Sequence, residues 1–391
     1  MKSESPSPSM TRKNFLRLAL AASAAAASAV WLEACQLLGL TATAQLAAPT
    51  TTPIPVTPAT WPTLTVVPTG MPSATTGPTA VPTATQDPGL VKLALVRTRD
   101  RAQGVQQALQ LLGLNPVQGK SVLLKPNFNS GDPAPASTSP DTLRALVLAL
   151  QDMGAGAITV ADRSGMGYSP TIMQNLGVAA MAQELGFATL SFEQLTSESE
   201  WEMLQPTGSH WRYGFPFARA ALDAGAVVQT CCLKPHRFGG HFTLSLKNAV
   251  GMVGVHYGSR TYNYMNELHG TADQRLMIAE VNTAYTPALI VLDGVEAFID
   301  QGPDVGTQVW GEAVLAGTDR VAMDAVGLAL LRMLGYTGVA AQGPIYQQDQ
   351  IPRAVELGLG AADPTKIRLL TGDEASRGYA DSILSFLQQN A

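Results

Sequence analysis

The sequence predicts an α/β protein with a largely parallel sheet that helices cover on both faces. Through residues 89–391, short apolar runs of strand length alternate with amphipathic segments of helix length. The runs are apolar throughout, which is typical of strands buried on both faces. This part of the chain is long enough for one large domain or two joined lobes, and the sequence leaves both open.

Each predicted strand is a short apolar run that ends at polar or turn-forming residues. We expect right-handed crossovers between the strands throughout, because helical segments separate most of them. The stretch 191–215 breaks this alternation and is predicted to be a loop or a small excursion. The predicted strands cover 91–96, 122–124, 157–161, 226–233, 288–292, 313–316 and 367–370.

The predicted helices have apolar residues on one face, and one of them has a well-marked start. Ser139 can cap this helix, Pro140 suits its first position, and Asp141 faces the positive end of the helix dipole. Leu143 and Leu146 then begin an apolar stripe at helical spacing. The other predicted helices cover 101–113, 171–185, 244–252, 272–285, 320–334 and the chain from about 379.

Residues 1–35 are predicted to be an export signal. Arg12, Lys13 and Arg17 precede an uncharged, alanine-rich run over 18–32. That run is shorter than the roughly 20 residues that span a bilayer. The segment 11–17 resembles a twin-arginine signal with lysine in place of the second arginine, so the twin-arginine and general secretory routes both stay open.

The end of this leader resembles a bacterial lipobox. Leu32, Glu33 and Ala34 precede Cys35, which would be lipidated and become the new N-terminus. We therefore expect an exported lipoprotein on the outer face of the cell membrane, with secreted or periplasmic protein as the alternative. Residues 36–88 are rich in threonine and proline and poor in large apolar residues, which predicts a disordered tether.

Composition argues against several classes of partner and cofactor. The net charge is −5 and charged residues make up 14% of the chain, without a basic stripe, so no nucleic acid is expected as partner. The adjacent Cys231 and Cys232 lie in an apolar run and are predicted to be buried thiols. The cysteine spacing fits neither a disulfide framework nor an iron–sulfur cluster.

Polar residues cluster directly after the predicted strands. In open α/β sheets, ligands bind outside the carboxyl ends of the strands, so we expect these residues to converge on one crevice. The groups that follow strands are Lys125-Pro126-Asn127, Asp162-Arg163-Ser164-Gly165, Lys234-Pro235-His236, Asp293-Gly294 and Gly317-Thr318-Asp319.

Lysines at the predicted crevice indicate a small anionic ligand. Lys125 and Lys234 each occur in a Leu-Lys-Pro turn after an apolar run, which would place both at the mouth of the crevice. Lys247 follows in a predicted helix start, with Asn248 beside it. The alternative for Lys125 and Lys234 is an ordinary solvated lysine at a strand end.

Histidines supply the candidate reactive groups. All five lie between His210 and His269, and His236 and His241 flank the pair Gly239-Gly240, which allows a ligand to approach the backbone closely. These two histidines could act as general acid and base. They could instead bind a divalent metal with Asp162 or Asp293.

One buried-looking carboxylate has three possible roles. Asp324 lies within an apolar helical segment. A buried carboxylate is costly unless it is paired. Asp324 could therefore be exposed on the outer face, serve as a structural partner or belong to the site.

The motifs over roughly 91–372 resemble the domain of unknown function 362 family. The resemblance rests on Lys125-Pro126-Asn127, Lys234-Pro235-His236, the run 243–251, Asp293-Gly294 and the run 321–325. Some relatives carry ferredoxin-type iron–sulfur segments, whose cysteines this chain lacks. The family name implies no reaction.

A fainter resemblance is to the nickel-pincer lactate racemases. In them a Pro-His element precedes a glycine-rich turn and a lysine that holds the cofactor. Pro235-His236, Gly239-Gly240 and Lys247 occur in a similar order, but the turn before Lys247 and the spacing to His256 or His269 differ.

The sequence thus predicts a membrane-tethered enzyme that acts on a small anion. Lys125, Lys234 and Lys247 would hold the anion, and His236 and His241 would transfer protons or bind a metal. Asn127, Asp162, Ser164, Gly239, Gly240, Asn248 and Asp293 complete the predicted site. The alternative is a lipoprotein that captures a small ligand without turning it over, for uptake or sensing.

Overall fold

The computed structural model describes residues 89–391, and within them a nine-stranded sheet organises the chain. The order along its main path is β11-β1-β10-β9-β7-β2-β3-β4, with β8 paired to β7 beside that path. A separate two-stranded sheet joins β5 to β6. The export signal, Cys35 and the tether lie outside the described residues.

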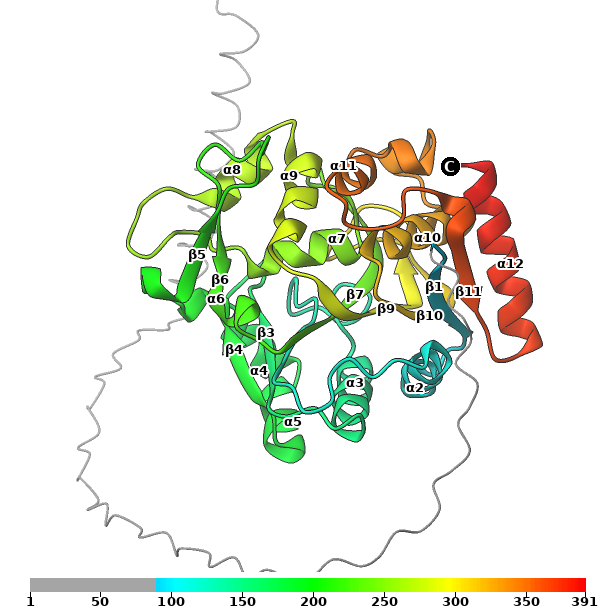
Figure 1. The fold of residues 1–391 in the computed structure, drawn as a ribbon, viewed down its shortest axis with the longest axis horizontal. Helices are drawn as coiled ribbons and strands as arrows, with labels where there is room; N and C mark the ends of the chain where they lie inside the picture. Colours follow the sequence, from blue (N-terminus) through cyan, green and yellow to red (C-terminus); the bar gives the residue numbers. More distant parts are fainter. Residues whose placement is uncertain (1–88) are drawn as a thin grey trace, which may run out of the picture. The chain divides into compact units, whose positions relative to one another are not determined.

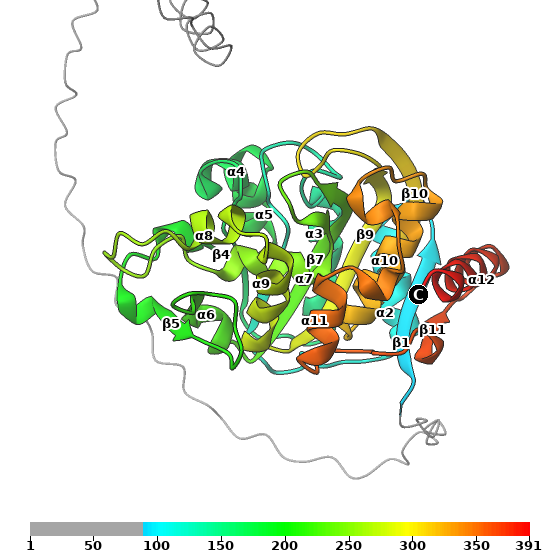
Figure 2. The same cartoon turned by 90° about the horizontal axis from the view of Figure 1, so that it is seen from above.

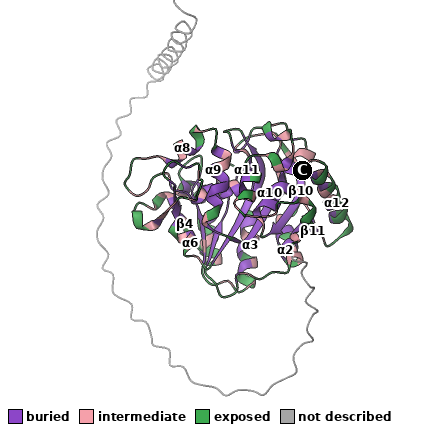
Figure 3. Cartoon of the chain, turned by 45° about the horizontal axis from the view of Figure 1, so that its top comes forward, coloured by how far each residue is buried: buried purple, intermediate pink, exposed green. Residues whose placement is uncertain are grey.

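The strands differ in length. The two longest, β7 and β9, lie next to each other in the centre of the sheet and are almost wholly buried. β7 is buried at every position, as expected for a strand covered on both faces. Figure 3 shows the central part of the sheet in the colour of buried residues. The strands are β1 (Val91–Arg97), β2 (Val122–Lys125), β3 (Ile158–Asp162), β4 (Ala188–Ser191), β5 (Trp201–Leu204), β6 (Phe215–Ala218), β7 (Ala226–His236), β8 (His241–Thr243), β9 (Pro287–Phe298), β10 (Gln308–Gly317) and β11 (Ile367–Leu370).

Helices cover both faces of the sheet, as predicted. α7, α9, α10 and α11 lie on one face and α2, α3, α4 and α5 on the other, while α12 packs at the outer edge beside β1 and β11 (Figures 1 and 2). The helices are α2 (Arg101–Leu112), α3 (Pro140–Asp152), α4 (Ser169–Asn175), α5 (Val178–Leu185), α6 (Arg219–Leu222), α7 (Ser245–Asn248), α8 (Tyr264–Gly270), α9 (Gln274–Val281), α10 (Arg320–Met333), α11 (Gln350–Glu356) and α12 (Glu374–Gln389).

Alternating side chains of the strands feed two separate cores, one on each face. Leu123 of β2 joins the core under α7, α9 and α10, while Val122 and Leu124 join the core under α2 and α3. This follows from the two-residue period of a strand. Cys231 and Cys232 are free and buried, as predicted.

The α/β fold with a mostly parallel sheet is confirmed, and one strand departs from the expected direction. β10 pairs antiparallel with both β9 and β1. All the remaining strands of the main path are parallel to one another, so β10 alone runs in the opposite direction. No helix lies between β9 and β10, so the chain returns directly and the expectation of crossovers throughout was wrong here. Consequently residues 317–319, which follow β10, lie at the opposite end of the strands from the carboxyl ends of β2 and β7.

Strand order reverses between β2 and β7. From β2 the chain builds outward through β3 to β4, and after the small β5–β6 sheet it crosses back to form β7 on the other side of β2. The crevice at such a reversal is where open α/β sheets bind ligands. Residues 89–391 belong to one compact unit. None of their helices combines the length and apolarity needed to cross a bilayer.

Asp324 of α10 holds the start of α7 in place. It is fully buried, and its carboxylate accepts hydrogen bonds from the backbone amides of Ser245 (2.7 Å) and Leu246 (3.3 Å) and from Gln350 (3.2 Å). The structural-partner role is therefore the one that the contacts support. Burial raises the pKa of Asp324 to about 7.

We expect Asp324→Asn to change how stability depends on pH. The folded-state pKa of about 7 lies above the ordinary 3.8, so the folded chain keeps its proton as pH rises while the unfolded chain loses it. Wild-type stability should therefore fall between about pH 4 and pH 7, by up to about 4 kcal/mol relative to Asp324→Asn. Urea unfolding at a series of pH values measures this, and parallel curves for the two proteins would contradict it.

Candidate functional site

A cavity of about 590 Å³ opens at the carboxyl ends of β2, β3 and β7, where strand order reverses. Lys125, Asp162 and His236, each the last residue of its strand, line it together with residues of α7 and α8. The volume lies in the range of small-molecule sites. The predicted crevice at the strand ends is therefore present.

A buried ion pair forms the floor of the cavity. Lys125 Nζ lies 2.6 Å from Asp162 Oδ1, and both side chains are almost fully buried. Asp162 also accepts hydrogen bonds from the backbone amides of Phe128 and Arg163, each at 2.7 Å. Burial lowers the pKa of Lys125 and raises the pKa of Asp162. Both members of the pair have protein partners, so the charge of Lys125 is largely compensated and attracts a ligand only weakly.

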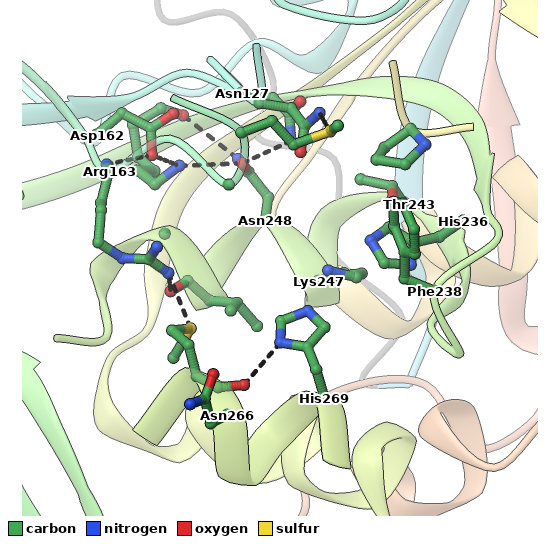
Figure 4. A pocket seen from close by; sticks show the side chains of 18 residues that line it. Asn127, Asp162, Arg163, His236, Phe238, Thr243, Lys247, Asn248, Asn266 and His269 are labelled. Atoms are coloured by element: carbon green, nitrogen blue, oxygen red, sulfur yellow. Dashed lines mark hydrogen bonds and ion pairs between the residues drawn. The ribbon is translucent and has the colours of Figure 1, made fainter. Parts of the chain in front are cut away.

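Two asparagines extend this floor toward β7. Asn248 Oδ1 accepts a hydrogen bond from Lys125 Nζ at 3.1 Å and one from Asn127 Nδ2 at 3.4 Å. The Nδ2 group of Asn248 donates to the carbonyl of Thr230 at 3.0 Å. Asn127 and Asn248 therefore line the cavity and connect the end of β2 to α7 (Figure 4).

Lys234 lies behind the cavity wall rather than at its mouth. Its side chain is fully buried, and Nζ donates to Asn127 Oδ1 (3.0 Å), to the carbonyl of Pro303 (3.0 Å) and to the carbonyl of Ala136. Burial lowers the pKa of Lys234 to about 8. With three acceptors around it, Lys234 joins loops together instead of facing a ligand.

Arg163 supplies positive charge without a direct ion pair to a carboxylate in residues 89–391, although the charges of Asp162 and Glu193 act on it. It is buried and lines the cavity, and its guanidinium donates to the carbonyls of Val253 (3.0 Å) and Ser164 (3.1 Å). Among residues 89–391, no carboxylate forms an ion pair with it. A cation held by neutral carbonyls retains its attraction for an anionic ligand.

Lys247 is the reactive-looking lysine of the cavity. It lies in α7 between His236 and His269 in Figure 4, and none of the residues 89–391 forms a hydrogen bond or ion pair with its Nζ. Burial, with Lys234 and Arg163 nearby, lowers the pKa of Lys247 to about 7. Near neutral pH this amine is therefore present in both its charged and neutral forms.

Two imidazoles flank Lys247. His236 is buried, His269 of α8 is exposed at the cavity, and their ring centroids lie 6.4 Å apart. Burial and the charge of Lys247 lower the pKa of both rings, that of His236 well below its ordinary value. Both imidazoles are therefore in the neutral form at pH 7.

Two buried polar atoms at the cavity have no protein partner among the described residues. They are His236 Nδ1 and Thr243 Oγ1. Of the two, His236 Nδ1 faces Gly240. A buried polar atom without a hydrogen bond costs about 1–3 kcal/mol. The cavity wall also has an apolar part, which includes Met166 and Phe238.

The structure brings only some of the predicted site residues to the cavity. Gly240 packs behind it, because a Cβ there would meet Lys247 Cε at 2.7 Å and His236 Nδ1 at 2.9 Å. Ser164 is buried outside the lining, where its hydroxyl donates to the carbonyl of Asn129. His241 and Gly239 line a separate cavity of about 340 Å³ beside Tyr336, which His236 also borders.

Asp293 lies away from the cavity because its strand continues past it. β9 runs on through Phe298, so Asp293 is a buried position within the strand instead of a strand end. Its carboxylate pairs with Arg101 at 2.9 Å and accepts a hydrogen bond from Thr142 at 2.6 Å. The apolar residues that resume after Gly294 are the sequence signal that the strand continues past Asp293.

The predicted metal ligands are not gathered. His236 and Asp162 line the main cavity, whereas His241 lines the smaller one. Within residues 89–391, no three side chains of His, Cys, Asp or Glu come together in a group that could hold a metal ion. Both Asp162 oxygens are already engaged.

Two cavity residues were given no role in the predicted site. Arg163 was included among the polar residues that follow strands but was not assigned a function, although it lines the cavity. His269 belongs to α8, a helix that was not predicted. The other three histidines lie elsewhere in the described chain. Of these, His210 pairs with Glu280 at 2.6 Å and His256 contacts the carbonyl of Tyr262 at 2.9 Å.

Gly251→Ala should destabilise the fold by about 1–3 kcal/mol, the usual cost of overpacking a buried site. A Cβ at Gly251 would lie 2.7 Å from Lys125 Nζ and closer still to Asp162 Oδ1. Thermal or urea unfolding measures the effect. Gly270→Ala is the matched control, because a Cβ there meets nothing within 4 Å. Equal stability of the two variants would contradict the close packing.

Comparison with known proteins places the cavity within a family. Among solved structures, the lactate racemase apoprotein from Thermoanaerobacterium thermosaccharolyticum aligns with 59% of this chain at 13% identity and a TM-score of 0.33. The alignment covers 54% of that protein, about half its length. No curated protein matches the chain. The family model described as Domain of unknown function (DUF362) matches residues 122–329, more than half of the chain and all of the cavity lining, so the chain belongs to this family.

Proposed function

We propose that the protein is a membrane-tethered enzyme that binds a small anion in the main cavity and transfers protons on it. The observation that carries the proposal is the excess of positive charge at Lys247 and Arg163. Among residues 89–391, Asp162 is the only carboxylate that lines the cavity, and it is already paired with Lys125. An anion entering the cavity would therefore meet two cations that lack a direct ion pair, in a partly buried setting where charge interactions are strong.

Proton transfer is the chemistry that the remaining groups support. Lys247 has a pKa of about 7, and the neutral His236 and His269 flank it. A pKa near the working pH is the best compromise for an acid or base that must both give and take a proton. Asn127, Asn248 and Thr243 would orient the bound molecule by hydrogen bonds. A divalent metal is not needed for this scheme.

Sulfate affinity should fall as pH rises through about 7, because Lys247 then loses its charge. Sulfate is a suitable probe since its own charge stays constant over this range. The charged and titratable groups that face Lys247 are Lys234, Arg163, His236 and His269. Isothermal titration between pH 6 and 9 should show a loss of about tenfold per pH unit above the midpoint.

Matched variants separate Lys247 from general surface charge. Lys247→Met should bind sulfate weakly and with a flat pH profile around 7. Lys120→Met removes an exposed lysine and should behave as wild type. Unchanged sulfate binding in Lys247→Met would overturn the proposed anion site.

The rival function is capture of a small anion without turnover. The same positive charge and open cavity would serve it, so binding alone does not separate the two. Incubation with small carboxylates and phosphates, followed by NMR of the products, does. In an enzyme, His236→Ala should abolish turnover and keep most of the affinity, whereas a binding protein shows no turnover in wild type.

The tether and lipid anchor are the part of the proposal that rests on residues 1–88. Cys35 is the expected lipidation site. Cys35→Ser should move the protein from the membrane fraction to the soluble exported fraction and abolish labelling by a fatty-acid analogue. Persistent membrane labelling in this variant would rule out Cys35 as the anchor.

A further inference from the structure

Three lysines surround the main cavity, and their amines differ in one decisive respect. Lys125 Nζ contacts Asp162, Asn248 and the carbonyl of Pro126, and Lys234 Nζ contacts three oxygen acceptors. Lys247 Nζ has no such partner among residues 89–391, although its residue is half-buried and lines the cavity. It is therefore the lysine of the three whose lone pair is available to a bound molecule.

From this contrast we propose that Lys247 is a nucleophile that forms an imine with the substrate, and that the substrate is a small oxo acid. The proposal rests on the proposed function, since it assumes that the cavity binds an anion. It adds that the anion carries an aldehyde or ketone group. The cationic Arg163 would hold the acid group while Lys247 reaches the carbonyl carbon.

The surroundings of Lys247 suit this chemistry. Gly240 packs against the Lys247 side chain, since a Cβ would lie 2.7 Å from Cε, so the stem is held in place from one side. An amine that is desolvated and close to other cations is present as the nucleophilic free base at neutral pH. The pKa of about 7, caused by burial, Lys234 and Arg163, agrees with this.

The step balances without any oxidant or reductant. The Nζ lone pair attacks the carbonyl carbon, a C–N bond forms, and the carbonyl π electrons move to oxygen, which takes up a proton. Nitrogen then loses one proton and the hydroxyl oxygen takes up a second, so that the C–O bond breaks and water leaves as the C=N bond forms. The iminium nitrogen releases its remaining proton to give the imine. His236 and His269, which flank Lys247, are neutral and can carry these protons. The products are one imine and one water.

Reductive trapping tests the proposal. The full exported protein is incubated with pyruvate and cyanoborohydride, which reduces an imine to a stable secondary amine. Peptide mass spectrometry should find the mass of pyruvic acid less one oxygen atom on Lys247. With pyruvate kept saturating at every pH, so that weaker binding does not limit the reaction, the rate of trapping should rise with pH to a plateau above about 7, whereas ordinary surface lysines react appreciably only at much higher pH.

Two variants and one altered probe make the test specific. Lys247→Arg keeps the charge and has no imine-forming amine, so trapping at this position should vanish while sulfate still binds. Lys120→Arg changes an exposed lysine and should trap as wild type. Methyl pyruvate, which lacks the negative charge, should label Lys247 at least tenfold more slowly.

The outcomes separate this proposal from the proposed function. Sulfate binding at the cavity without any trapped adduct on Lys247 would overturn the imine and leave the anion site standing. A label spread evenly over surface lysines, and unchanged in Lys247→Arg, would also overturn it. Absence of both sulfate binding and trapping would overturn the anion site itself.

Discussion

The buried ion pair between Lys125 and Asp162 is the interaction on which the candidate site depends. It joins the ends of β2 and β3, and Asn248 of α7 connects to it through Lys125. Removing one partner of a buried ion pair leaves the other charge uncompensated, which typically costs about 3–5 kcal/mol. The pair also shapes the electrostatics of the cavity, because Asp162 forms its ion pair with Lys125 and not with Lys247 or Arg163.

The contrast among the lysines shows why residue type alone did not assign roles. Lys125 and Lys234 occur in the same Leu-Lys-Pro context, and the sequence placed both at the mouth of the crevice. β7 extends to His236, so Lys234 lies inside the sheet and meets the carbonyls of Ala136 and Pro303. Those acceptors come from loops that are distant in the sequence, and no local sequence pattern predicts them.

The alternation of apolar runs with helical segments was enough to predict the sheet, its two helical layers and the edge where the cavity opens. It did not reveal that β9 continues past Asp293 or that β10 turns back beside it. Both depend on strand pairing over the whole sheet, which local periodicity does not encode. The crowding of histidines between positions 210 and 269 likewise overstated the site, since only His236 and His269 reach the main cavity.

The three-way contact of Lys234 has a consequence for how the protein assembles. Its Nζ joins β7 to Asn127 and Ala136 on one loop and to Pro303 on another, segments separated by more than 150 residues in the chain. Contacts of such long range form late, because loop closure must precede them. The walls of the cavity should therefore appear only when the central sheet is complete, so a partly folded chain would not present a formed site.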